Sequence, residues 1–65
     1  MGELSRTELS DLIDEWILHE RNRNLLKRRL LDGIKYEKLA EEFDLSVQQA
    51  KTIVAKCTKT IRKHA

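Results

Sequence analysis

The chain contains no proline and only two glycines in 65 residues, so almost every position is compatible with an α-helix. Its apolar residues recur at steps of three and four through most of the sequence, which is the spacing of one helical face and not the alternation of a strand. The single cysteine excludes an internal disulfide framework and zinc sites built from several cysteines. These features predict an all-α fold that is held together by its apolar core.

Four helices are expected, and because no linker or low-complexity segment divides them they form a single domain that spans residues 1–65. Their approximate ranges, taken from the apolar spacing, are 6–20, 24–32, 36–43 and 46–63. Ser5 with Glu8, and Ser46 with Gln49, each have the spacing of an N-terminal capping box. These pairs therefore mark the starts of the first and fourth helices.

The remaining boundaries and core positions follow from individual residues. Asn22 or Asn24 is expected to cap the second helix, and Gly33 is expected to end it in the left-handed conformation. Trp16 lies on the apolar stripe of the first helix, and Cys57 lies on the stripe of the fourth. Both are expected in the core, so Cys57 is predicted to be a packing residue and not a nucleophile.

The net charge of +2 conceals blocks of opposite sign along the chain. Residues 1–20 carry six acids and one base, residues 21–35 carry six bases and one acid, and residues 36–45 are acidic again. Residues 46–65 carry five bases and no acid. The first basic block fits a solvated surface as well as a binding surface, whereas the acid-free terminal block indicates a surface that binds a polyanion.

A short helix, a three-residue turn and a longer helix with a polar, basic outer face are the parts of a helix-turn-helix. Ala40 is small where the two helices must cross closely, and Asp44 tolerates the left-handed backbone of the turn better than most residues. Gln48 carries an amide, which can recognise adenine through two hydrogen bonds. Gln49 has the same group, but the capping box with Ser46 explains it more simply.

Residues 36–63, YEKLAEEFDLSVQQAKTIVAKCTKTIRK, resemble the helix-turn-helix with which bacterial sigma factors read promoters, the part called region four. Residues 7–33 are compatible with the two helices that precede this motif in that family. The resemblance implies a four-helix, sigma region four-like domain. It covers one module only, because 65 residues are too few for the separate domain with which a full sigma factor melts DNA.

The resemblance also implies roles for residues of the fourth helix. Those implied to read base edges are Val47, Gln48, Lys51 and Thr52. Those implied to lie near phosphates are Gln49 and Lys56, and the remaining expected DNA-binding residues are Lys35, Tyr36 and Lys59. Sigma factors often have arginine and glutamate in place of Val47 and Gln48, so their usual promoter sequence is not expected here. They commonly have threonine or serine in place of Lys35, so the third helix lacks a side-chain cap.

Several classes of function have no support in the sequence. A glycine-rich phosphate loop and a Ser/His/Asp set are both missing, so an enzyme, a cofactor and a small-molecule substrate are not expected. His19 and His64 are far apart and have no further ligands at helical spacing, so no metal site is expected. Three aromatic residues make a poor stacking platform for RNA. No apolar run approaches about 20 residues, so a cytoplasmic protein without a membrane segment is expected.

The leading hypothesis is therefore sequence-specific binding of double-stranded DNA by a small stand-alone transcriptional regulator of bacterial or phage type. The alternative is a protein-interaction module that binds RNA polymerase or a sigma factor without reading DNA. A helix-turn-helix monomer of this size contacts one half-site and binds weakly, so RNA polymerase or a second copy of the chain is a further expected partner.

Overall fold

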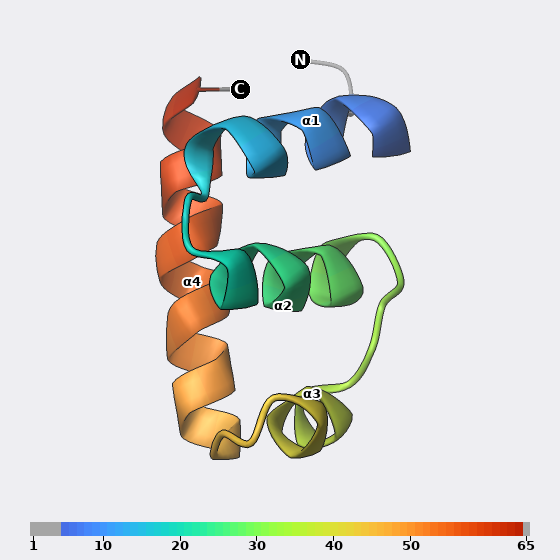
Figure 1. Ribbon diagram of the computed structural model, residues 1–65, viewed down its shortest axis with the longest axis vertical. Helices are drawn as coiled ribbons and strands as arrows, with labels where there is room; N and C mark the ends of the chain where they lie inside the picture. The colour runs from blue at the N-terminus through green and yellow to red at the C-terminus, as the bar shows by residue number, and fades with distance from the viewer. Residues whose placement is uncertain (1–4, 65) are drawn as a thin grey trace.

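The computed structural model describes residues 5–64, and within them it contains four α-helices and no strand. The helices are α1 (Arg6–Trp16), α2 (Glu20–Leu30), α3 (Tyr36–Glu42) and α4 (Val47–His64). The all-α fold class is thus confirmed. In Figure 1, α4 forms a column along one side of the molecule, and α1, α2 and α3 are stacked beside it from one end to the other. All three of them pack against α4.

The boundary between α1 and α2 differs from the predicted one. α1 ends at Trp16 instead of residue 20, because Ile17 leaves the helical conformation with φ −103° and ψ 97° while its side chain remains buried. The N-cap of α2 is His19, which makes no capping hydrogen bond with its side chain. The predicted cap at Asn22 or Asn24 is wrong, because both residues lie inside α2. A side-chain cap contributes only about 1 kcal/mol, which core packing can outweigh.

The end of α2 has the predicted glycine but an earlier last helical residue. α2 ends at Leu30, and Gly33 adopts a φ of +67°, in the left-handed region that favours glycine. Beyond it, the Ile34 N–H donates a hydrogen bond to the Arg28 carbonyl at 3.2 Å, and the Ile34 side chain packs against the core. Gly33 therefore turns the chain from α2 toward α3.

The connection from α3 to α4 consists of residues 43–46 and contains the second left-handed residue, Asp44, with φ +56°. The Leu45 N–H donates to the Ala40 carbonyl at 2.8 Å, which closes the end of α3. Ser46 and Gln49 form the predicted capping box: the Gln49 N–H donates to Ser46 Oγ at 3.0 Å, and the Ser46 N–H donates to Gln49 Oε1 at 2.9 Å. These contacts fix the direction in which α4 leaves the turn.

At the start of α1, the Glu8 N–H donates to Ser5 Oγ at 3.1 Å, so the predicted cap there is also confirmed. Lys35 is the N-cap of α3 and makes no side-chain capping bond, as expected for a residue without an acceptor.

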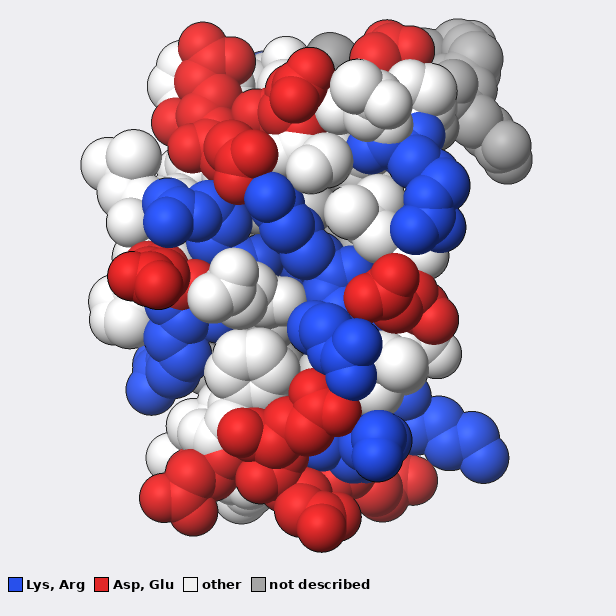
Figure 2. All heavy atoms as spheres, turned by 45° about the vertical axis from the view of Figure 1, so that its right-hand side comes forward, with Lys and Arg blue, Asp and Glu red and all other residues white. Residues whose placement is uncertain are grey.

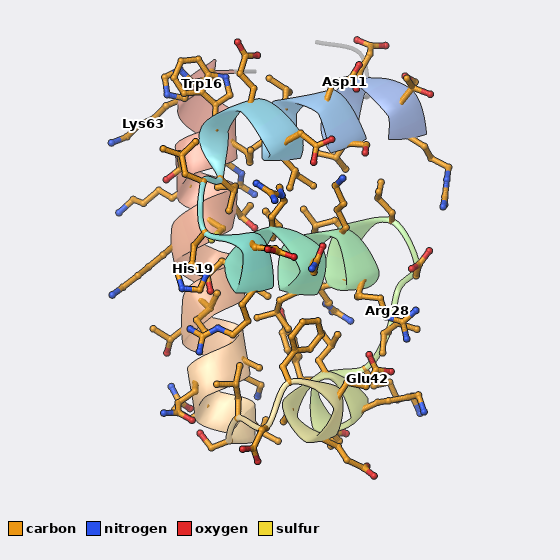
Figure 3. All side chains as sticks on the ribbon, viewed as in Figure 1. Asp11, Trp16, His19, Arg28, Glu42 and Lys63 are labelled. Carbon is orange, nitrogen blue, oxygen red and sulfur yellow. The ribbon has the colours of Figure 1, made fainter. Side chains whose placement is uncertain are left out.

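The core lies where the apolar stripe of α4 meets the three shorter helices. Its buried side chains are Ile13, Ile17, Leu25, Leu26, Leu39, Val54, Cys57 and Ile61. The burial of Cys57 confirms its predicted place. The predicted core position of Trp16 is wrong. Its side chain is 40% exposed, and its ring stacks on the ring of His64 with the two centroids 3.5 Å apart. Trp16 is the last residue of α1, so its side chain meets the final turn of α4 at the edge of the core, as Figure 3 shows.

Candidate nucleic-acid interface

α4 is the longest helix of the described chain, with 18 residues, and its outer face is polar. Since Ala50, Val54, Cys57 and Ile61 are buried, helical periodicity turns the intervening residues outward. Every predicted DNA-binding residue of α4 except Val47 is exposed: Gln48, Gln49, Lys51, Thr52, Lys56 and Lys59. Val47 is half-buried at the first position of the helix. Of the two predicted residues that precede α4, Lys35 is exposed and Tyr36 is half-buried.

The charge of this face is of one sign. α4 carries five basic side chains and no acid: Lys51, Lys56, Lys59, Arg62 and Lys63. Within residues 5–64, none of the ion pairs includes a residue of α4. In Figure 3, Lys63 projects from α4 away from the other three helices. The positive charge of α4 is therefore available to an external partner.

Three basic residues of α2, Arg23, Lys27 and Arg28, have a different environment, because acids of neighbouring elements lie opposite them. Lys27 Nζ is 2.6 Å from a carboxylate oxygen of Asp14 in α1, and Arg23 Nε is 3.8 Å from the same oxygen. Figure 2 shows acidic and basic side chains interspersed over the face that it presents, with acids gathered toward the two ends. The ion pairs of Arg23 and Lys27 therefore link α2 to α1.

Arg28 is the centre of a second ion-pair cluster. Its Nη2 lies 2.7 Å from Glu42 at the end of α3, and its Nη1 lies 3.5 Å from Asp32. Arg6 also reaches Asp32, at 3.6 Å. The hydrogen bond between Arg28 and Glu42 favours the charged form of both groups, so it lowers the pKa of Glu42 and raises the pKa of Arg28. Figure 3 shows Arg28 and Glu42 directed toward one another between α2 and α3. This pair links α3 to α2.

Arg29 is a basic residue of α2 that lies beside the outer face of α4. Its guanidinium carbon lies 4.4 Å from the centroid of the Tyr36 ring, and Lys51 Nζ lies 5.8 Å from the same centroid. Both distances are within the range of cation–π attraction. One ring, that of Tyr36, thus lies near a cation of α2 and a cation of α4.

Two open grooves run along opposite sides of α4. We call the larger one, of about 490 Å³, the basic groove; its polar lining residues are Arg29, Tyr36, Lys51, Thr58, Lys59 and Arg62. The smaller one, of about 300 Å³, is lined by Arg21, Leu45, Gln48, Gln49, Thr52 and Ile53. The structure thus brings Tyr36, Lys51 and Lys59 together on one side and Gln48, Gln49 and Thr52 on the other.

Three of the charged lining residues were not among the predicted site residues: Arg21, Arg29 and Arg62. Arg62 could have been included, because it follows Lys51 by 11 residues and so lies three helical turns along the same line of α4. Arg21 and Arg29 belong to α2, and only the packing of α2 on α4 brings them to the grooves. The sequence carries no local signal for such a contact.

The described residues contain no group of three or more histidine, cysteine, aspartate or glutamate side chains that could hold a metal ion. Burial raises the pKa of the Cys57 thiol, which disfavours the reactive thiolate. Within residues 5–64, no helix has the length and hydropathy needed to cross a bilayer.

Comparison of the chain with models of protein families, with curated proteins and with solved structures found no match.

Proposed function

We propose that the chain binds double-stranded DNA sequence-specifically, with α4 in the major groove, and that it acts as a small transcriptional regulator. The observation that carries this proposal is the outer face of α4, an 18-residue helix with five basic residues, no acid and no ion pair within the described chain. Phosphate neutralisation by lysine and arginine supplies most of the affinity in protein–DNA complexes.

The arrangement of α3 and α4 supports the same proposal. The major groove is about 12 Å wide and admits a single α-helix. Gln48 and Thr52 are exposed in the first two turns of α4, next to a turn that is fixed by the Ser46–Gln49 capping box. In helix-turn-helix proteins the N-terminal residues of the second helix contact base edges. Gln48 is therefore the residue proposed to read adenine, and the resemblance to sigma region four points to the same helix.

The alternative, a module that binds RNA polymerase or a sigma factor without reading DNA, has less support. Its strongest feature is Leu18, which is 81% exposed in the connection between α1 and α2. Single exposed apolar side chains are normal on folded domains, however, so Leu18 does not by itself indicate a partner. RNA polymerase and a second copy of this chain remain proposed partners of a DNA-bound domain.

Selection from a random pool of duplexes tests the proposal directly. The expected result is an enriched motif whose preference at one base pair weakens in Gln48→Ala, while Lys56→Ala lowers the affinity for all sequences alike. Retention of the pool without any enriched motif would exclude sequence-specific reading. Absence of duplex binding at low salt would exclude DNA binding altogether and favour the interaction module.

A further inference from the structure

We propose that the basic groove holds the phosphate backbone of one DNA strand beside α4, with Arg29, Lys51, Lys59 and Arg62 as the phosphate ligands. This inference rests on the proposed binding of duplex DNA and adds to it a specific strand contact. It also adds Arg29, a residue of α2, to the interface. The groove on the opposite side of α4 then faces the other strand.

The composition of the basic groove matches a polyanion. Four of its lining residues are cations, drawn from the last turn of α2 and from α4, and no acid lines it. None of the four belongs to an ion pair within residues 5–64. This sets Arg29 apart from its neighbour Arg28, which Glu42 and Asp32 neutralise. A groove of this kind concentrates positive potential where an anion can enter.

Tyr36 and the backbone hold Arg29 in place before any ligand binds. The guanidinium lies 4.4 Å from the Tyr36 ring centroid, and Arg29 Nη1 donates a hydrogen bond to the Ile34 carbonyl at 3.1 Å. A guanidinium stacked by its face retains donors along its edge, and these suit a phosphate. Tyr36 also approaches Lys51, so one ring positions two of the four cations. Tyr36 is accordingly a positioning residue of the groove.

The spacing of the cations favours an extended backbone over a free phosphate ion. Lys51 and Arg62 are 11 residues apart, so their positions are separated by about 16 Å along the axis of α4. A single phosphate cannot touch both ends of such a row, whereas a strand carries a phosphate for every rise of about 3.4 Å. The opposite groove contains one cation, Arg21, among amide, hydroxyl and apolar side chains. The strand in the basic groove is therefore held by more charges.

The test measures the salt dependence of binding to a duplex of random sequence between about 50 and 200 mM salt. The double variant Arg29→Gln/Arg62→Gln removes two groove cations. The charge-matched control, Arg6→Gln/Lys38→Gln, removes two cations that line neither groove, and α1 begins on the side of the molecule away from α4 (Figure 1). Because each phosphate contact contributes a slope of about 0.9, the groove variant should lose about 1.8 from its log–log slope.

In affinity terms, a slope lower by 1.8 means that wild-type binding falls about 12-fold more than that of the groove variant over this fourfold change in salt. The control should keep the wild-type slope. Equal slopes for the two double variants would overturn the groove assignment. Wild-type binding that is itself absent would instead refute DNA binding, so the two failures are distinguishable.

Folding is monitored by thermal melting of each variant. Lys59→Gln/Arg62→Gln provides a second groove variant; both residues lie on α4, and neither side chain makes a hydrogen bond or an ion pair within residues 5–64. It should show the same loss of slope. Tyr36→Leu should weaken binding more than Tyr36→Phe, since only phenylalanine keeps the ring that positions Arg29. Identical affinities of the two Tyr36 variants would overturn the positioning role.

Discussion

The replacement of Ala40 by leucine tests most directly how closely α3 packs against α4, the arrangement that the proposed helix-turn-helix requires. Ala40 is 6% exposed in α3, the short helix that packs on α4, and its carbonyl accepts the hydrogen bond from Leu45 that closes the helix. Leucine adds three carbon atoms at a site that is already enclosed. Overpacking of this kind typically costs about 1 to 3 kcal/mol, because side chains or backbone must shift to make room.

That cost is large for this chain. A domain of 65 residues has a total free energy of unfolding of roughly 3 to 10 kcal/mol, so Ala40→Leu would remove a substantial share of it. A loss of 1 kcal/mol lowers the melting midpoint of so small a domain by about 4 to 8 °C. We therefore expect a midpoint at least about 4 °C below that of the wild type in a circular dichroism melt.

The matched control is Ala55→Leu, which makes the same chemical change at an exposed position of α4. Alanine and leucine have similar helix propensities, so this variant should melt within about 0.5 kcal/mol of the wild type. Equal midpoints for Ala40→Leu and Ala55→Leu would show that Ala40 does not lie at a close crossing. The assignment of the turn would then be wrong.

Three further predictions address the proposed DNA contacts of α4, the Arg28–Glu42 ion pair and the Cys57 thiol. Gln48→Ala should change the preference at one base pair and leave the salt slope intact, whereas Lys56→Ala should reduce the slope by about 0.9 without changing the preference. Arg28 lowers the pKa of Glu42 below its ordinary value of 4.5, so the stability that Glu42 contributes is present at neutral pH and is lost as the pH falls through its folded pKa. In Glu42→Gln, the free energy of unfolding should therefore fall less on acidification than in the wild type. An unchanged pH profile of unfolding would contradict this stabilising role of Glu42. Cys57 should react slowly with a thiol reagent until the protein is denatured, and Cys57→Ala should keep its DNA affinity; rapid labelling of the native protein would contradict its burial.

The features that the sequence predicted well are local ones. Ser46 and Gln49 are three residues apart, and their capping box depends on hydrogen bonds within a single turn. Gly33 and Asp44 both adopt the left-handed conformation, which few other residues tolerate. The buried side of α4 was also predicted from the sequence, because the apolar spacing repeats over several turns of this 18-residue helix.

The errors arose where neighbouring helices decide the structure. The apolar spacing of the first segment continues through Ile17, and Ile17 is indeed buried, but as a residue of the connection and not of the helix. Trp16 has the period of a core residue, yet it stacks on His64, which lies 48 positions later in the chain. A periodic pattern specifies which side of an element faces inward. It does not specify where the element ends or which partner covers its last residue.

The same distinction explains why two similar basic blocks have different expected roles. The cations of α2 could be assigned only from the structure, because the acids that neutralise them, Asp14 and Glu42, belong to α1 and α3. The cations of α4 were accessible to sequence reasoning, since α4 contains no acid and its buried stripe turns them away from the other helices. Arg29 differs from both groups. It belongs to the basic block of α2, but the Tyr36 ring holds it beside α4. An inference from charge runs alone would therefore treat Arg29 in the same way as Lys27 and Arg28, whose charge is already compensated within the fold.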